Sequence, residues 1–212
     1  MTRKPVQDAT SYLPKSKSLP VLKKAARGCE ACDLYRHATQ AVFGAGRSQA
    51  TIVFIGEQPG NEEDLQGVPF VGPAGKVFER ALAEAGIDRA DVYVTNVVKH
   101  FKFEERGKRR IHKKPNAAEI TACRPWLEAE ISAVQPKMIV CLGATAAQAV
   151  LGGDYRLTKE RGVFSAHDWA PQVTATTHPS AILRAPDAEK RSQMYADFVS
   201  DLKNALQKLR RQ

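Results

Sequence analysis

Thr51–Gly60 reads TIVFIGEQPG, a run of β-branched and apolar residues that ends abruptly in a polar Gly-Pro turn. Three similar apolar runs follow along the chain: VYVTNVV (residues 92–98), KMIVCL (137–142) and QVTATT (172–177). Helix-like stretches lie between and after them, at residues 75–85, 117–134, 144–151 and 187–209. Strands that alternate with helices predict an α/β fold, in which helices cover both faces of a parallel sheet.

The chain has 212 residues, enough for one large domain with a substantial core. Its net charge of +9 is unevenly distributed, because residues 99–115 hold eight Lys or Arg but only two Glu. A solvated face would normally mix both signs. The concentration of positive charge therefore indicates a polyanionic partner such as a nucleic acid.

The N-terminal stretch MTRKPVQDATSYLPKSKSLP lacks the apolar core of a signal peptide. No other stretch is apolar enough to span a membrane. We therefore expect a cytoplasmic, monomeric protein without disulfides, with residues 1–17 as a partly ordered arm and 18–212 as a single domain.

Polar segments follow three of the four apolar runs. GEQPG (residues 56–60) follows the first, and HPSAILR (178–184) follows the fourth. The second leads through Asn96 into a long loop, expected at residues 101–115, that holds most of the basic segment. Ligands of such sheets bind outside the carboxyl ends of the strands, where these segments converge. Each one alone could be an ordinary turn, but the three together favour a binding or catalytic site.

The four cysteines indicate a metal site or cluster. Cys29 and Cys32 form a CxxC pair, whereas Cys123 and Cys141 lie far downstream. One alternative is a redox CxxC with two buried thiols, and another is a structural Cys₄ zinc site. The absence of a second CxxC, with Cys123 in a predicted helix and Cys141 in a predicted strand, argues against a zinc ribbon.

Five motifs together resemble a known family: CEACDLYRHA, FIGEQPGNEEDLQGVPFVGPAGKVFERAL, VTNVVKHF, CRPWLEAEI and THPSAILR. They are similar to the iron–sulfur uracil-DNA glycosylases of the family-4 type, over nearly the whole chain from residue 18. Within that group, GEQPG and the basic segment KRRIH resemble the UdgX branch, whose members excise uracil and become covalently attached to DNA.

The resemblance implies a three-layer sandwich with a four-stranded parallel sheet, the uracil-DNA glycosylase fold. It also implies a 4Fe–4S cluster held by Cys29, Cys32, Cys123 and Cys141. Because the implied reaction moves no electrons, the cluster is expected to be chiefly structural. The implied partner is uracil-containing DNA, single-stranded or in either form.

The same resemblance assigns roles at the base-binding site. Phe70 is expected to stack on the flipped uracil, Asn96 to pair with its O4 and N3–H, and His178 to donate to O2. Gly56, Pro59 and Gly60 are expected to contact the substrate. Arg184 is expected to fill the space that the base leaves, while Lys108, Arg109, Arg110 and Ser180 contact phosphates.

His112, at the end of the basic segment, is the expected nucleophile. By resemblance Glu57 orients its ring and accepts its proton, and Gln58 lies near the base or the attacking position. A neutral N-alkyl imidazole is a poor leaving group, so the sugar would stay attached. Two alternatives remain: a turnover glycosylase in which His112 only positions its loop, and a non-catalytic DNA-binding module with a Cys₄ zinc site.

Overall fold

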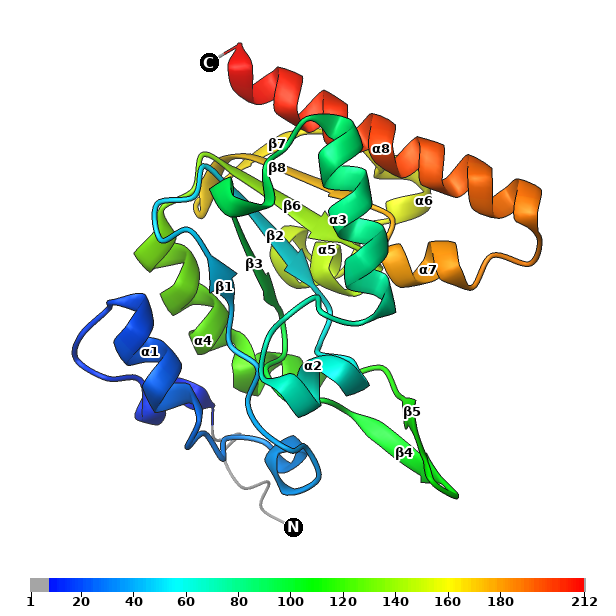
Figure 1. Ribbon diagram of the computed structural model, residues 1–212. Helices are drawn as coiled ribbons and strands as arrows, with labels where there is room; N and C mark the ends of the chain where they lie inside the picture. Colours follow the sequence, from blue (N-terminus) through cyan, green and yellow to red (C-terminus); the bar gives the residue numbers. More distant parts are fainter. Residues whose placement is uncertain (1–7, 212) are drawn as a thin grey trace.

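The central sheet has six strands in the order β1-β3-β2-β6-β8-β7 (Figure 1). The computed structural model describes residues 8–211, so residues 1–7 of the expected arm lie outside the described residues. The strands of the sheet are β1 (Ala45–Gly46), β2 (Ile52–Gly56), β3 (Val92–Asn96), β6 (Met138–Leu142), β7 (Ser165–His167) and β8 (Ala170–Thr176).

The four middle strands, β3, β2, β6 and β8, are parallel and correspond to the four apolar runs. The expected parallel sheet between helices is therefore confirmed. The expected number of strands is wrong, because β1 and β7 add antiparallel pairs at the two edges. These edge strands have two and three residues, too few to form a recognisable apolar run.

Every residue of β2, β3 and β6 is buried. A strand that is covered on both faces is expected to have a continuous apolar sequence. The burial of these three strands therefore explains why they can be recognised in the sequence. The helices among the described residues are α1 (Leu19–Ala26), α2 (Asn61–Gln66), α3 (Pro73–Ala85), α4 (Ala117–Val134), α5 (Ala144–Leu151), α6 (Leu157–Glu160), α7 (Pro179–Leu183) and α8 (Ala188–Arg210).

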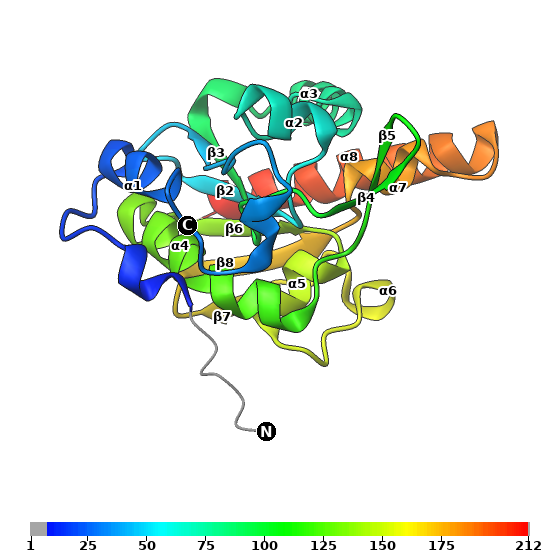
Figure 2. The same cartoon turned by 90° about the horizontal axis from the view of Figure 1, so that it is seen from below.

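The sheet separates two apolar cores. Seen from below in Figure 2, α3 and α8 lie on one side of the strands and α4 and α5 on the other. The core on the α3–α8 side is centred on Phe54, Phe78 and Phe198, and the opposite core contains Trp126 together with three of the four cysteines. The three-layer arrangement follows from this division.

Helix α4 begins where its capping residues predict. The Asn116 side chain accepts a hydrogen bond from the Glu119 backbone N–H, and the Glu119 carboxylate accepts one from the Asn116 N–H. This reciprocal arrangement satisfies two helix-end donors and fixes the first turn. It also sets the start of the helix that carries Cys123.

A buried ion pair joins the segment after β3 to α4. The Lys99 ammonium donates to the Glu130 carboxylate, to the Thr95 hydroxyl at 2.8 Å and to the Asn96 carbonyl at 2.7 Å. Glu130 also accepts hydrogen bonds from the Tyr93 hydroxyl and a backbone N–H. Every proton of the ammonium has an acceptor, which is the condition under which a buried charge is tolerated.

Lys99→Met is expected to destabilise the protein by about 3–5 kcal/mol, because it leaves the Glu130 carboxylate buried without its counter-ion. Urea unfolding followed by circular dichroism measures the change. Arg47→Met is the matched control, since the Arg47–Asp91 pair is more than half exposed on both side chains and such pairs contribute only about 0.2–1 kcal/mol. Equal losses in the two variants would contradict this assignment.

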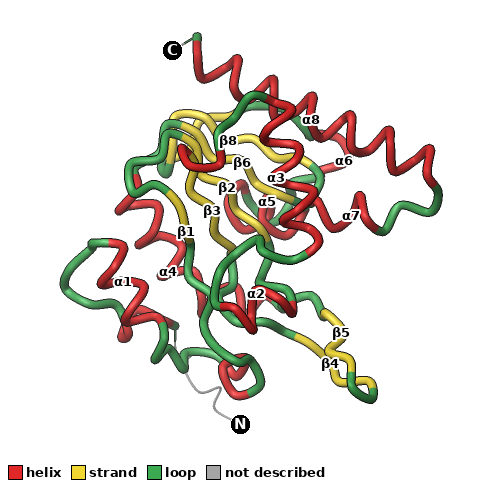
Figure 3. The backbone as a smooth tube through the Cα atoms, viewed as in Figure 1, coloured by secondary structure: helices red, strands yellow, loops and turns green. Residues whose placement is uncertain are grey.

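The segment 101–115, expected to be a long loop, instead contains an antiparallel hairpin. Strands β4 (Phe103–Arg106) and β5 (Arg109–His112) pair with each other through a turn at Gly107, whose φ is +59°. Figure 3 shows this hairpin standing out from the body of the molecule, apart from the main sheet. His112 lies at its base, paired with Phe103, so the hairpin fixes its distance from the sheet.

The N-terminal part of the chain packs on the cysteine side of the sheet. A 3₁₀ helix at Ala9–Tyr12 contacts α4, and Ala9 is fully buried. Two further 3₁₀ helices span Asp33–Arg36 and Arg89–Asp91. Within residues 8–211, no helix combines the length and the apolar character needed to cross a bilayer.

Candidate active site

A cavity of about 740 Å³ opens at the carboxyl ends of the parallel strands. Its walls come from the three segments expected to converge, together with the hairpin base and the start of α5. Nine of the expected site residues line it: Glu57, Gln58, Gly60, Phe70, Asn96, His112, His178, Ser180 and Arg184. Gly56 and Pro59 are buried beside it, whereas Lys108, Arg109 and Arg110 do not line it.

Gly56 allows Phe70 and Asn96 to approach each other. A Cβ at Gly56 would lie 2.3 Å from Asn96 Oδ1 and 2.9 Å from Phe70 Cζ, so no larger residue fits. Phe70 has a φ of +59°, a conformation that costs a non-glycine residue of order 1–3 kcal/mol. Its ring packs against Phe78 with centroids 5.2 Å apart. The strained backbone thus holds an aromatic face at the cavity wall.

Asn96 ends β3 with its side chain at the cavity. Its backbone carbonyl accepts from Lys99, but within the described residues no hydrogen bond engages its side-chain amide. The residue is only 3% exposed. A buried amide needs partners for its donor and acceptor, so this group is suited to bind a ligand with a complementary edge.

His178 is held in one tautomer. Its Nδ1 accepts a hydrogen bond from the Ser180 backbone N–H at 3.1 Å and lies 2.8 Å from the Ser180 hydroxyl. Burial, assisted by the charges of Arg184 and His112, lowers the pKa of His178 to about 4. The ring is therefore neutral at pH 7, and because Nδ1 is an acceptor, its proton is on Nε2. Ser180, expected at phosphate, has this partner within the protein.

His112 and Glu57 meet at the cavity. His112 Nε2 lies 3.5 Å from Glu57 Oε1, while the other carboxylate oxygen, Oε2, accepts from the Thr145 hydroxyl. Burial lowers the pKa of His112 below 6.5; the Glu57 charge opposes this shift, and Arg184 adds to it. The ring is consequently neutral at pH 7, the state in which a nitrogen keeps a lone pair for bonding.

Gln58 joins the two ends of the hairpin. Its side-chain oxygen accepts from the Lys102 N–H at 3.2 Å, and its side-chain nitrogen donates to the carbonyls of Lys102 and Lys113 at 3.1 and 3.0 Å. The same nitrogen lies 2.9 Å from His112 Nε2. Gln58 was expected near the base or the attacking position. Its role in the reaction stays a prediction, and its contacts also fix the hairpin against the turn that follows β2.

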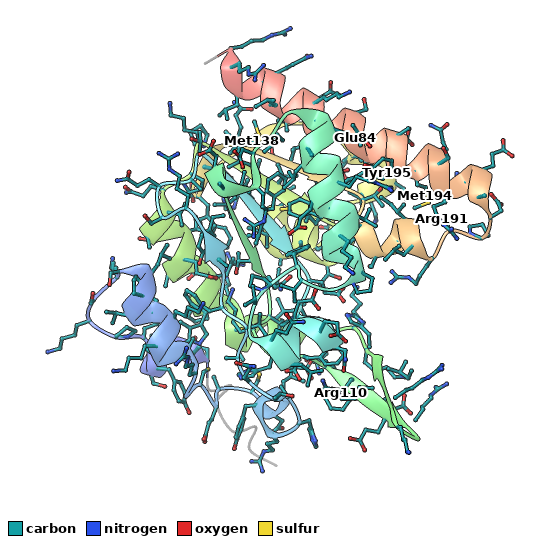
Figure 4. The ribbon with its side chains drawn as sticks, viewed as in Figure 1. Glu84, Arg110, Met138, Arg191, Met194 and Tyr195 are labelled. Atoms are coloured by element: carbon teal, nitrogen blue, oxygen red, sulfur yellow. The ribbon has the colours of Figure 1, made fainter. Side chains whose placement is uncertain are left out.

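Arg110, expected to contact phosphate, is bound within the protein. It donates to Asp64 at 2.7 Å and to Asn61 at 2.8 Å, both in α2, and its guanidinium lies over the rings of Phe101 and Phe103. Figure 4 shows the side chain between the hairpin and α2. Asp64 is completely buried, so this ion pair fixes the hairpin rather than leaving a cation free for DNA.

Most cations of segment 99–115 are likewise paired. Lys99, Lys102, Arg106, Arg110 and Lys113 each lie within 4.0 Å of a carboxylate. Lys108, Arg109 and Lys114 have no such partner among the described residues and are exposed, as is Arg184 at the end of α7. The positive charge available to a polyanion is therefore smaller than the sequence suggests, and lies at the hairpin tip and the cavity rim.

Three of the four cysteines are close enough to affect one another. The proximity of Cys29 and Cys32 raises the pKa of Cys123, although burial is the main reason that it reaches about 12. Cys123 Sγ also accepts the Lys99 backbone N–H at 3.2 Å. Cys141 belongs to the same core. Among residues 8–211, no three His, Cys, Asp or Glu side chains are grouped so that they could hold a metal ion.

Two residues that organise the site were not predicted. Glu63 accepts from the backbone N–H groups of Gly60 and Gly72, and so ties the first polar segment to the loop that carries Phe70. Thr145 binds Glu57 from the start of α5. The signal for Thr145 was its place three residues after the end of β6, the one parallel strand whose end received no role.

Comparisons with known proteins agree with this geometry. Residues 43–203 match the model of the Uracil DNA glycosylase superfamily. The chain belongs to this superfamily. It is 37% identical over 193 residues to a protein of Archaeoglobus fulgidus named Type-4 uracil-DNA glycosylase, covering 88% of this chain and 90% of that one. A protein of the same name from Thermotoga maritima is 38% identical over 183 residues, covering 85% and 91%.

A third superfamily relative, from Sulfurisphaera tokodaii and also named Type-4 uracil-DNA glycosylase, is 37% identical over 181 residues, covering 82% of this chain and 79% of that protein. The family match spans all three strand-end segments, the hairpin and α5. The superfamily expected from the motifs is therefore confirmed, while the branch within it remains a proposal.

Proposed function

We propose that this protein excises uracil from DNA and then becomes covalently attached to the abasic sugar through His112. The observation that supports attachment is the position of His112 Nε2 in the same cavity as Asn96 and His178, 3.5 Å from the Glu57 carboxylate. A neutral imidazole at the reacting centre is a nucleophile rather than a phosphate ligand. Membership of the superfamily and the names of the relatives support the excision step.

Uracil selectivity is proposed to arise at Asn96 and Phe70. The free Asn96 amide can donate to O4 and accept from N3–H of uracil, whereas cytosine would present a donor to its donor. A mispaired buried polar group costs about 1–3 kcal/mol, enough to disfavour cytosine about tenfold or more. Phe70 offers the flipped base an aromatic face, and Arg184 at the rim is proposed to fill the space that the base leaves.

Excision requires that the glycosidic electron pair leave with uracil N1. His178 Nε2–H is proposed to donate to uracil O2, a hydrogen bond that strengthens as negative charge develops on the base. The departing anion then takes a proton from solvent. The positive charge that develops on the sugar faces the Glu57 carboxylate.

Attachment is proposed to follow through the tautomer of His112 that carries its proton on Nδ1. The Nε2 lone pair forms the bond to C1′, which makes the ring a cation beside Glu57. The Nδ1 proton is then lost to solvent and not to Glu57 as first expected, because Glu57 faces Nε2; a neutral N-alkyl imidazole remains. Because this group departs badly, unlike a glycosyl ester of a carboxylate, the product persists.

The second candidate is a turnover uracil-DNA glycosylase, favoured by the Type-4 names of the relatives. In that case water would capture the sugar, and His112 would only hold its hairpin. The decisive experiment incubates the protein with single-stranded DNA that contains one uracil, followed by a denaturing gel and mass spectrometry. A heat- and detergent-stable product with the mass of the protein plus the abasic strand supports attachment. Free abasic DNA alone would support turnover.

We further propose that Cys29, Cys32, Cys123 and Cys141 hold a 4Fe–4S cluster. All four lie in or against one core, and the Trp126 indole N–H in that core is buried without an acceptor among the described residues. A cluster there would supply acceptors and tie the N-terminal segment to α4 and β6. Brown protein with about four irons per chain supports this ligand set. Colourless protein with zinc would favour the DNA-binding module.

Attachment is expected to depend on pH through His112. The rate should be constant near pH 7–8 and fall in acid, with its midpoint below pH 6.5, because burial lowers the pKa of this ring and only the neutral form has the lone pair. Stopped-time gels between pH 5 and 8 measure the rate, with uracil release followed in the same samples. A midpoint above pH 7 would contradict a neutral, partly buried nucleophile.

A further inference from the structure

The two oxygens of the Glu57 carboxylate have different partners. Oε1 lies 3.5 Å from His112 Nε2, and Oε2 accepts the hydrogen bond of the Thr145 hydroxyl. Among the described residues, no hydrogen bond joins Thr145 to His112. It lines the same cavity and is only 6% exposed. Any influence of Thr145 on the histidine must therefore pass through Glu57.

Thr145 is anchored to the sheet rather than to a loop. It is the second residue of α5, whose N-cap, Gly143, immediately follows β6. The Gly143 N–H donates to the Thr176 carbonyl of β8 at 2.8 Å, so the start of the helix is bonded to the neighbouring strand. Side chains on regular elements are held more precisely than those on loops. The hydroxyl is thus a fixed point for a flexible carboxylate.

We propose that Thr145 positions Glu57 for the capture of the sugar by His112, an inference that rests on the proposed covalent function. Glu57 has three rotatable side-chain bonds and is partly exposed, so without the hydroxyl its carboxylate would leave the position that faces His112 Nε2 for part of the time. The nucleophile would then lose its anionic neighbour. Slower formation of the sugar cation would lower attached and free abasic DNA alike and would not change their ratio. Water would capture a larger share of sugars.

The quantity that tests this is the ratio of attached DNA to free abasic DNA for each uracil released. Thr145→Val keeps the shape of the side chain and removes the hydroxyl, and it is expected to lower this ratio about tenfold. Thr145→Ser restores the hydroxyl and should return the ratio to within about twofold of the wild type. Thr145→Ala repeats the loss with a smaller side chain, so that the result does not depend on how valine fits.

Thr174→Val is the matched control. Thr174 is a buried threonine of β8 whose hydroxyl has no hydrogen-bond partner among the described residues, so its ratio should equal that of the wild type. Wild-type ratios in Thr145→Val and Thr145→Ala would overturn the positioning role, as would a fall in uracil release with an unchanged ratio. If the wild type itself yields no attached DNA, the proposed covalent function fails instead, and the two failures are told apart in the same assay.

Discussion

His112→Ala is expected to reduce covalent attachment to background, while uracil release stays within about tenfold of the wild type. The two activities separate because they use different groups. Departure of the base depends on Asn96 and His178, and neither forms a hydrogen bond with His112. Capture of the sugar needs the imidazole lone pair, which alanine lacks. The variant should therefore release free abasic DNA, with water taking the place of the ring.

A denaturing gel measures attachment and chromatography of free uracil measures excision, both from one reaction. His37→Ala serves as the control, because His37 is an exposed histidine that does not line the cavity. A stable attached product from His112→Ala would show that another group is the nucleophile. Glu57 would be the first suspect, and its glycosyl ester would be distinguished by cleavage in mild alkali.

The parallel sheet and its long helices could be predicted because their signals are local. Buried strands such as Ile52–Gly56 are continuous β-branched runs, and α4 starts at a capping box that can be read directly from Asn116 and Glu119. The predicted bounds 117–134 and 144–151 agree with α4 and α5. Convergence of the strand-end segments then follows from the rule that parallel strands share one carboxyl edge.

The hairpin was missed because its stability comes from contacts distant in sequence. Arg110 pairs with Asp64, 46 positions earlier, and Gln58 holds both ends of the hairpin from the turn after β2. The signal that could have predicted it was the alternation of Phe101 and Phe103 with polar residues ahead of a turn glycine. The count of basic residues overestimated the positive charge available to a polyanion for the same reason. The sequence does not show which lysines and arginines are paired with a carboxylate in the folded protein.

Thr145 shows a different limit of sequence reasoning. Its hydroxyl matters because it donates a hydrogen bond to the carboxylate of Glu57, which lies 88 positions earlier in the chain. In the sequence it is one threonine in an alanine-rich helix, and nothing in its neighbours marks it. The order of the strands does mark it, because β6 is adjacent to β2 in the sheet and the residues after both strands must meet.

His178→Phe is expected to slow uracil release by about 10²–10³-fold, the usual cost of removing one preorganised donor from a developing anion. The ring is suited to this role because the Ser180 backbone N–H occupies Nδ1 and burial keeps the pKa near 4. Nε2–H is therefore a donor at every pH between about 5 and 8. Phenylalanine retains most of the ring volume but has no donor.

Ser180→Ala separates this donor role from simple packing. It removes the hydroxyl 2.8 Å from Nδ1 but leaves the backbone N–H that fixes the tautomer, so uracil release should fall by less than about tenfold. Single-turnover release of uracil from excess enzyme measures both variants without interference from attachment. Because attachment requires a vacated sugar, His178→Phe must slow attachment by the same factor as release. A variant that releases uracil slowly yet attaches at the wild-type rate would contradict the order of the two steps. If Ser180→Ala loses as much uracil release as His178→Phe, the effect belongs to the shape of the HPS turn and not to the Nε2–H donor.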